Sequence, residues 1–462
     1  MEEKEKGPKE APNMSEFVHC KDKEKPLNVQ CFSELAESIC VDIEPISFPS
    51  EKTKVRVPMV IRELANYTNK LQFNGDKIMY YNGICWQEVT EWELGIFLRN
   101  FAQALGWNAE YHSNIESLLK QFKCDLYGTM QKNRDVVAFS NGTLEINSLE
   151  FREHHQRDYL TAYIPYEYNP NAICRKWLEC LEEWLTEEDD RVLAQEISSI
   201  GIARVHTEKL PYLYGGGCNG KSVFLEVVTK AYGNSNVCNY PLKEVLDRNG
   251  NCLAMMRGYL LNISAENGQK VEESPLFKAY VSGEAMKCRE LYKNPVTTDD
   301  YPPSIIAANN LPATDDFSEG YFRRLLFIPF AKTIPKEKVN PNLAKEIAEK
   351  ELPGVMNWII EGARRLRQQG RFTATRKSIQ MAEDYRKDAD SIFQFVEENN
   401  NKSGKERLSI VYAEFRQWAA ENGFKTPNVK NFADRLRKIG LMVKKSTGNI
   451  TYVWWPDNDL PE

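Results

Sequence analysis

The sequence predicts an α/β protein whose largest part is a parallel sheet covered by helices. Between residues 173 and 370, short apolar runs alternate with helical patterns, as in LPYLYG, SVFLEVVTKAYG, YLLNIS, PSIIAANN and RRLLFIPF. Strands that alternate with helices in this way are typical of a parallel sheet with helices on its faces. At ~150 residues per domain, a chain of 462 residues leaves room for a further domain on either side.

The N-terminal part is expected to hold a flexible leader over residues 1–50 and a small mixed α/β domain over residues 51–172. The first 30 residues have mixed charge and few large apolar side chains, too few to bury a core. Further along, IMYYNGICW and VVAFSNGTLEI each place Asn-Gly between apolar runs, which predicts β-hairpins, and WELGIFLRNFAQALG has helical spacing.

The C-terminal part has the element order of a winged helix after a polar, helix-prone linker over residues 371–390. Residues 391–462 contain three helical runs and then a hairpin that turns at residues 446–449. Residues 402–453 hold 11 Lys and Arg against four Asp and Glu, although the whole chain has a net charge of −6. This charge favours duplex binding; a docking or oligomerisation domain is the alternative. The expected DNA contacts here are Lys430, Arg435, Arg437 and Lys438 on the outer face of the last helix, and Lys444 and Lys445 near the hairpin tip.

The composition excludes several classes of protein. Hydrophobic residues make up 42% and charged residues 27% of the chain, as in ordinary globular proteins. No apolar run is long enough for a spanning helix, and the charged start MEEKEKGPKE is unlike a secretory signal, so a cytoplasmic protein is expected. The 11 cysteines include no CxxC pair, which indicates reduced thiols rather than a zinc site.

The strongest motif is a glycine-rich loop that matches the P-loop pattern G-x-x-x-x-G-K-[ST]. An apolar run, PYLY, precedes it and an amphipathic helical run follows it, as a P-loop requires. Its backbone N–H groups would hold phosphates, Lys221 would bridge the β- and γ-phosphates of ATP, and Ser222 would bind Mg²⁺. The alternative is a glycine-rich turn that precedes Lys-Ser by chance. The expected nucleotide-binding residues are Gly215, Gly216, Gly217, Cys218, Asn219, Gly220, Lys221 and Ser222.

Four further residues are candidates because they stand at strand ends. Glu266 follows YLLNIS and is expected to polarise the attacking water and support Mg²⁺, and Asn309 follows SIIAA and is expected to hold that water. Arg323 and Arg324 precede LLFIPF and are expected to stabilise phosphoryl charge on a neighbouring subunit. A solvated turn is the alternative for Glu266 and Asn309, and a strand-edge charge is the alternative for the arginines.

The ordered set of motifs resembles the superfamily-three helicases, in the branch of phage and plasmid primase-helicases related to the poxvirus primase-helicase. The set consists of GGGCNGKS, ISAEN, LFKAYVSGEAMKCRELYKNP, AANNLP and EGYFRRLLFIPF, with FSNGTLEI, IPYEYNPNA and QEISSIGIARV upstream. The resemblance implies an AAA+ type fold, a metal-side role for Glu266, a sensor role for Asn309 and an arginine finger at Arg323 or Arg324. It also implies a channel hairpin that binds single-stranded DNA. The cations in that segment are Lys278, Lys287, Arg289 and Lys293.

The family implies an ATP-dependent, ring-forming DNA helicase, with six subunits, that replicates a phage, plasmid or other mobile element in a bacterial cytoplasm. Its partners would be single-stranded and duplex DNA, other copies of itself, and a separate primase or initiator. The chain departs from the family in having a lone Glu266 and no room for a primase domain in the leader, so no priming is expected. A replication initiator that uses ATP only as a switch and a small-molecule kinase or ligase remain alternatives.

Overall fold

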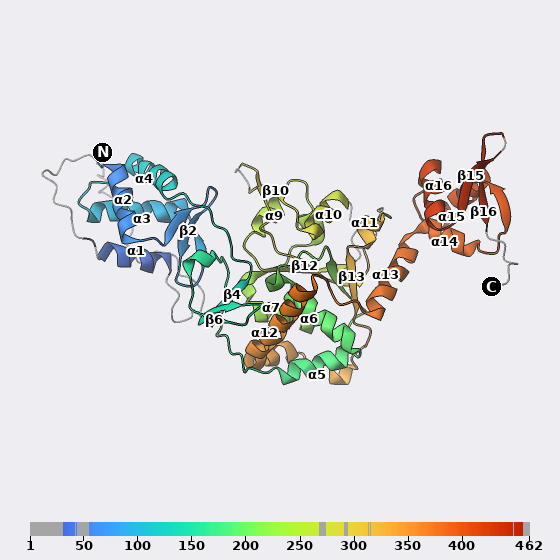
Figure 1. The fold of residues 1–462 in the computed structure, drawn as a ribbon, viewed down its shortest axis with the longest axis horizontal. Coiled ribbons are helices and arrows are strands. Elements are labelled where there is room, and N and C mark those ends of the chain that lie inside the picture. Colours follow the sequence, from blue (N-terminus) through green and yellow to red (C-terminus); the bar gives the residue numbers. More distant parts are fainter. Residues whose placement is uncertain are drawn as a thin grey trace, which may run out of the picture. The chain divides into compact units, whose positions relative to one another are not determined.

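The structure, a computed structural model, describes residues 31–41, 43, 55–267, 274–290, 294–312, 314, 316–446 and 448–455. The chain divides into two compact units (Figure 1). The first consists of Met1–Lys132, Ala138–Gly142 and Glu153–Thr161, and the second of Asn133–Val137, Thr143–Arg152 and Ala162–Glu462. Among the described residues, none of the helices has both the length and the apolar character that crossing a membrane requires.

The first unit is a helical layer with a small antiparallel sheet. Its elements are α1 (Phe32–Val41), α2 (Val57–Tyr67), β1 (Leu71–Phe73), β2 (Ile78–Tyr81), β3 (Trp86–Val89), α3 (Glu91–Ala104), α4 (His112–Asp125) and the 3-10 turn Gln156–Asp158. β2 and β3 form the predicted hairpin, because Tyr81 pairs with Trp86 and the Asn82 side chain accepts hydrogen bonds from two backbone N–H groups of the turn. A further sheet contains β4 (Val136–Phe139), β5 (Gly142–Glu145) and β6 (Phe151–Arg152).

The prediction of an unstructured leader over residues 1–50 is wrong for α1. Leu35 and Ile39 are spaced four residues apart and are 3% and 7% exposed, in one core with Phe97 and Leu98 of α3. One turn of apolar residues is enough to form a packed helix because a larger apolar surface covers it. Residues 1–30, 42 and 44–50 of that prediction lie outside the described residues.

The second unit is built on a five-stranded sheet in which every neighbouring pair is parallel, as predicted. The strand order is β13-β7-β12-β9-β8. The strands are β7 (Leu210–Tyr214), β8 (Val237–Cys238), β9 (Leu261–Asn267), β12 (Ser304–Asn310) and β13 (Leu325–Pro329). β7, the first strand, therefore lies between the last two, so that the chain segments leaving β7, β12 and β13 emerge side by side at one edge.

Helices cover both faces of this sheet (Figure 1). They are α5 (Arg175–Trp184), α6 (Glu188–Ala203), α7 (Lys221–Tyr232), α8 (Leu242–Val245), α9 (Asn251–Met255), α10 (Ser274–Ser282), α11 (Glu319–Phe322), α12 (Leu343–Gln369) and α13 (Arg376–Ala389), with 3-10 turns at Asn234–Asn236 and Lys336–Lys338. α6, α7 and α12 lie together on one side of the sheet. α6 and α12 approach so closely that a Cβ at Gly362 would lie 2.5 Å from the carbonyl oxygen of Gln195. A small hairpin of β10 (Met286–Cys288) and β11 (Val296–Thr298) lies on the other side.

The helix-prone segment predicted as a linker over residues 371–390 contains α13, which packs on the sheet. Tyr385 is 5% exposed and its hydroxyl donates a hydrogen bond to the Pro312 carbonyl oxygen at 2.5 Å. Its ring lies 5.5 Å from that of Phe327 in β13 and 5.8 Å from that of Phe322. Tyr385, together with Met381, Ala382 and Ala389, thus packs a mostly polar helix against the core of the sheet.

The C-terminal part has the three predicted helices and the predicted hairpin, with one additional strand. The elements are α14 (Ser391–Glu398), β14 (Gly404–Arg407), α15 (Leu408–Glu421), α16 (Val429–Lys438), β15 (Met442–Ser446) and β16 (Ile450–Trp455). β14 and β15 both pair antiparallel to β16. The core contains Phe395, Phe415 and Phe432, the last two with ring centroids 4.8 Å apart.

Candidate functional site

The predicted nucleotide-binding residues lie at the carboxyl edge of the parallel sheet. Pro329, Tyr214, Ala308 and Glu266 stand in one row across β13, β7, β12 and β9. The glycine-rich loop, residues 215–220, follows Tyr214 directly, and Asn309 follows Ala308 on the neighbouring strand. Ligands of open α/β sheets bind at this edge, beyond the carboxyl ends of the strands.

The glycine-rich loop is held in place from two sides. The buried Asn219 side chain donates a hydrogen bond of 2.9 Å to the Phe330 carbonyl oxygen, just beyond β13. Gly220, the residue before α7, has φ of 89°, and a Cβ there would lie 2.5 Å from the ring of Trp184 at the end of α5. Only glycine therefore fits at this position, for its conformation and for its lack of a side chain. Sequence reasoning found Gly220 but missed Trp184, whose role depends on packing.

Lys221 brings the loop and Asn309 together. Its Nζ donates hydrogen bonds to the carbonyl oxygens of Gly215 at 2.6 Å and Gly216 at 2.9 Å, and to Oδ1 of Asn309 at 3.2 Å. The residue is 6% exposed, and this burial lowers the pKa of its ammonium group. The charge is held at the sheet edge by neutral oxygens, so it is available to an anion.

The outer side of the loop is open. Gly216, Gly217, Cys218 and Ser222 are exposed, and a Cβ at Gly216 or Gly217 would have no atom within 4 Å. Backbone N–H groups at the start of a helix, with a buried lysine beside them, fit a phosphate chain. Ser222, in the first turn of α7, is exposed beside the loop, and its metal-binding role stays a prediction.

Glu266 lies at the carboxyl end of β9, in the same row of the sheet as Tyr214, the residue before the glycine-rich loop. Its backbone pairs with Ala308 in β9, two strands from β7. The side chain of Glu266 lies outside the described residues, so its predicted contact with metal and water stays a prediction.

The two arginines lie at the opposite edge of the sheet and differ in their surroundings. Arg324 has a side chain only 9% exposed, and it donates hydrogen bonds to the Gly320 carbonyl oxygen at 2.7 Å and to the Ser282 hydroxyl at 2.8 Å. The Arg323 side chain is 55% exposed, and it forms a surface ion pair with Glu208 at 3.1 Å. Arg324 therefore joins α11 to α10, whereas the Arg323 side chain lies at the surface.

The expected DNA contacts before Asn309 fall into different environments. Lys278 on α10 is half-buried, and its Nζ lies 2.7 Å from Oδ2 of Asp316 and 3.0 Å from the Ser318 hydroxyl, so its expected DNA contact stays a prediction. Lys287 is exposed on β10, and Arg289 is exposed just beyond it in the β10–β11 hairpin. Lys293 lies outside the described residues.

In the C-terminal part, Lys430, Lys438, Lys444 and Lys445 are exposed as predicted. Arg435 is not: it forms an ion pair with Asp390, its guanidinium lies 3.8 Å from the ring centroid of Phe317, and burial lowers its pKa. The outward prediction for Arg435 is wrong because Asp390, the residue between α13 and α14, places a carboxylate opposite it. Arg437 is exposed but paired with Asp434 at 2.5 Å.

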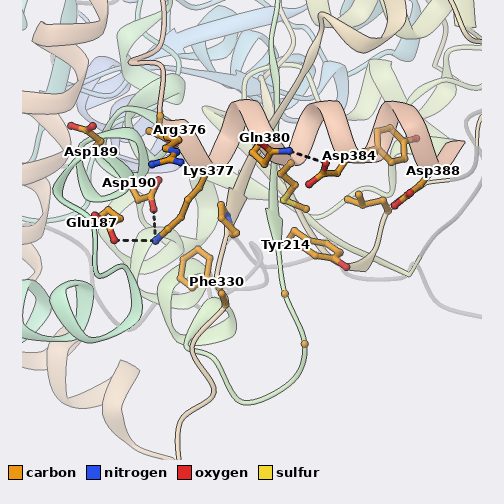
Figure 2. A pocket seen from close by; sticks show the side chains of 18 residues that line it. Glu187, Asp189, Asp190, Tyr214, Phe330, Arg376, Lys377, Gln380, Asp384 and Asp388 are labelled. Carbon is orange, nitrogen blue, oxygen red and sulfur yellow. Dashed lines mark hydrogen bonds and ion pairs between the residues drawn. The ribbon is translucent and has the colours of Figure 1, made fainter. Parts of the chain in front are cut away.

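A cavity that the sequence did not indicate adjoins the glycine-rich loop (Figure 2). Its volume is about 960 Å³, and it lies between the first turn of α6, the ends of β7 and β13, and α13. Its apolar lining includes Tyr214, Phe330 and Met381, and its charged lining includes Asp190 and Lys377. Because the sequence predicts a linker where α13 lies, no sequence signal pointed to this cavity.

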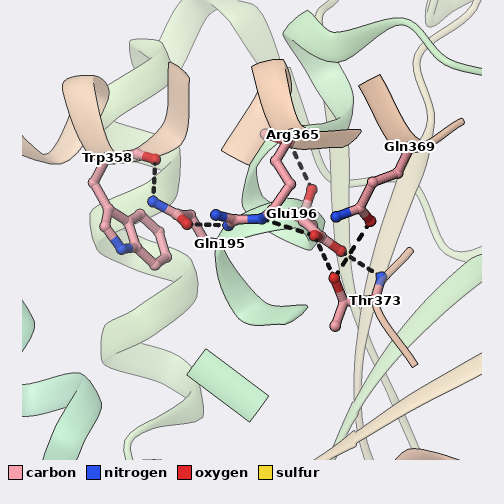
Figure 3. Close-up of polar contacts among 7 residues, drawn as sticks. Gln195, Glu196, Trp358, Arg365, Gln369 and Thr373 are labelled. Carbon is pink, nitrogen blue, oxygen red and sulfur yellow. Dashed lines mark hydrogen bonds and ion pairs between the residues drawn. The ribbon is translucent and has the colours of Figure 1, made fainter. Parts of the chain in front are cut away.

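A buried polar cluster fixes the segment that leads into α13 (Figure 3). Glu196 of α6 is fully buried, and its carboxylate accepts hydrogen bonds from Nε of Arg365 at 2.9 Å and from the backbone N–H and hydroxyl of Thr373, both at 2.7 Å. Gln195 beside it donates to the Trp358 carbonyl oxygen at 2.8 Å. α6, α12 and the entry to α13 thus meet at one carboxylate.

Replacing Arg365 with leucine is expected to lower the free energy of unfolding by about 3–5 kcal/mol, because it leaves the Glu196 charge buried without its partner. Urea unfolding followed by circular dichroism measures this. The exposed pair of Lys345 and Glu349 is the control, and Lys345→Leu should cost no more than about 1 kcal/mol. Equal losses of unfolding free energy in the two variants would contradict the role assigned to Arg365. Adding Glu196→Leu to Arg365→Leu should recover part of the lost free energy, because the unpaired buried charge is then removed.

Comparison with known proteins places two regions of the chain in families. Residues 61–186 match the family described as "D5 N terminal like", and residues 213–324 match a "Family of unknown function (DUF5906)". The second match contains the glycine-rich loop, Lys221 and Asn309.

The curated relatives are viral. "Putative helicase 121R" of Invertebrate iridescent virus 3 is 25% identical over 49% of this chain and 26% of its own length. "Putative helicase L207/L206" of Acanthamoeba polyphaga mimivirus is 23% identical over 65% of this chain and 35% of its own. "Putative primase C962R" of African swine fever virus is 26% identical over 43% of this chain and 22% of its own. The chain thus spans about a third or less of the length of these relatives.

Among solved structures, the C-terminal region of NrS-1 covers 86% of this chain and 99% of its own length, with a TM-score of 0.47 and 10% identity. In the sequence matches, a D5 N-terminal-like domain occurs with relatives named helicase and primase. These sequence matches support a phage- or virus-type primase-helicase-like protein.

Proposed function

We propose that this chain is the ATP-driven motor of a DNA helicase that serves the replication of a phage, plasmid or other mobile element, and that it works as a ring. The observation that carries the proposal is the position of Lys221, buried at the carboxyl edge of the sheet with its Nζ between the glycine-rich loop and Asn309. A single ammonium group in contact with both elements fits an AAA+ type P-loop ATPase.

The glycine-rich loop and the start of α7 would bind the phosphates through backbone N–H groups, and Lys221 would move its hydrogen bonds from carbonyl oxygens to phosphate oxygens. Asn309 is then free to hold the attacking water. Ser222 and Glu266 would hold Mg²⁺, which neutralises charge on the phosphates when bound.

The distance between the sheet edge that carries Arg323 and the edge that carries the glycine-rich loop supports hydrolysis at a subunit interface. Leu325 pairs with Leu210 and Pro329 with Tyr214, so β13 runs from the arginine edge to the loop edge. At ~3.3 Å per residue, its five residues span about 16 Å, beyond the reach of Arg323 to its own loop. A role in phosphoryl transfer thus requires the loop of a second copy, as a ring provides.

The experiment that tests the proposal is ATP hydrolysis with and without single-stranded DNA, followed by unwinding of duplexes with a single-stranded tail at either end. We expect DNA-stimulated hydrolysis and unwinding. ATP binding with negligible turnover would instead favour a replication initiator that uses ATP as a switch. Turnover by a monomer, indifferent to DNA, would favour a small-molecule kinase or ligase.

The C-terminal part, with the element order of a winged helix, is proposed to bind duplex DNA through exposed lysines. A variant with Lys438, Lys444 and Lys445 all changed to glutamine should bind duplex more weakly. Its log affinity should depend less steeply on log salt, by about 0.9 for each phosphate that the variant no longer neutralises. Fluorescence anisotropy at several salt concentrations measures both quantities.

The matched control changes three exposed lysines elsewhere, Lys176, Lys345 and Lys350, to glutamine, so that the net charge is equal. If both variants have the same salt dependence, the C-terminal lysines do not bind phosphates, and the part serves docking or assembly.

A further inference from the structure

We propose that the cavity beside the glycine-rich loop binds the base of the nucleotide, and that Asp190 accepts a hydrogen bond from the exocyclic amine of a purine. This inference rests on the proposed function, because it assigns the part of the nucleotide that the loop itself does not select. A loop that binds phosphates through backbone N–H groups cannot distinguish one base from another.

The position and lining of the cavity fit a purine attached to phosphates at the loop. Tyr214 directly precedes the glycine-rich loop, and Gly215 and Gly216 belong to it. All three residues line the cavity, so the loop and the cavity adjoin each other. The volume of about 960 Å³ exceeds what one nucleoside needs, within the range of small-ligand sites. Tyr214, Phe330 and Met381 supply the apolar and aromatic surface on which a base can pack.

Asp190 is a buried carboxylate in the cavity whose hydrogen-bonding capacity is not satisfied by the neighbours that the structure describes. The residue is 1% exposed, and neither carboxylate oxygen has a hydrogen-bond partner among the described residues. Lys377 of α13 is its ionic neighbour, with Nζ at 3.3 Å from Oδ2, and the same Nζ lies 3.6 Å from Glu187 (Figure 2). A buried carboxylate that lacks hydrogen bonds is costly, so donors supplied by a ligand would offset its burial.

The chemistry of this pair selects among bases. A carboxylate only accepts hydrogen bonds and an ammonium group only donates them. Adenine offers an amine at position 6 beside ring nitrogens that accept, and guanine offers an amine at position 2 and a carbonyl at position 6. Asp190 and Lys377 complement either arrangement. Hypoxanthine, the base of inosine, has no exocyclic amine and leaves Asp190 with one donor fewer.

The test measures the dissociation constants of ADP, GDP and IDP by calorimetry, because diphosphates are not hydrolysed. The unaltered protein should bind ADP or GDP at least about tenfold more tightly than IDP, as expected for a hydrogen bond to a charged group. Asp190→Leu should bring that ratio close to one. Asp189→Asn, an exposed neighbour on the same cavity rim, should leave it unchanged.

Each ratio is measured within one protein, so a partial loss of folding does not alter it. Preference for ADP assigns adenine and preference for GDP assigns guanine, and both support a reading role for Asp190. Equal binding of all three by the unaltered protein, or a preference that survives in Asp190→Leu, overturns the inference and leaves the proposed function intact. Absence of binding by any of the three overturns the proposed function, and the inference with it.

Discussion

Replacing Arg323 with alanine is expected to lower the rate of ATP hydrolysis by about 10³-fold or more, while each protomer still binds ATP. The exposed guanidinium of Arg323 lies at the sheet edge opposite its own loop, so its loss should affect only the transition state at the neighbouring protomer's nucleotide. Steady-state hydrolysis and nucleotide titration measure the two effects separately. Arg386→Ala is the matched control, since that arginine is also exposed and also paired with a surface glutamate.

A mixing experiment separates this role from a purely structural one. Mixing Arg323→Ala with a variant that lacks the Lys221 ammonium should partly restore hydrolysis, because some interfaces then combine an intact arginine with an intact loop. No recovery in rings known to have exchanged subunits would contradict action between protomers. Arg324→Ala is a different case: its side chain is buried and bonded to Gly320 and Ser282, so that variant should lower thermal stability.

Replacing Lys221 with methionine should lower hydrolysis by about 10²-fold or more, because the charge that stabilises the transferring phosphoryl group is lost. Methionine keeps the buried aliphatic part of a side chain that is 6% exposed, so the fold should be retained. Hydrolysis rates and thermal unfolding measure the two outcomes. Lys230→Met, further along the same helix, is the control, because Lys230 pairs with Glu226 at the surface. Unwinding at the normal rate by Lys221→Met would refute the assigned site.

The sequence predicts the parallel sheet and the glycine-rich loop well, because both have strong local signals. Apolar runs separated by helices are enough to identify β7, β9, β12 and β13, with the loop at the end of β7. The Asn-Gly turn of β2 and β3 is equally clear. In such segments burial and local propensity favour the same conformation.

Elements that depend on distant partners were not predictable. β14, with the sequence GKER, has no apolar alternation and becomes a strand only because Lys405 and Arg407 pair with Trp454 and Tyr452 of β16. α13 depends on Tyr385 inserting beside β13, and Arg435 on a carboxylate 45 residues earlier. The same holds for Asp190 and Lys377, which belong to two helices far apart in the sequence, α6 and α13. Periodicity describes one element at a time and carries no information on such pairs.

The contact between Trp184 and Gly220 also constrains how this protein can exchange parts with its relatives. Trp184 falls in the last three residues of the D5 N-terminal-like match, whereas Gly220 belongs to the separate match that begins at residue 213. The ring lies 2.5 Å from where a Cβ at Gly220 would be. A chimera that took the two segments from different relatives would bring an unmatched surface against the loop. The two segments would therefore have to be exchanged as one piece, or the contact between Trp184 and Gly220 restored by further substitutions.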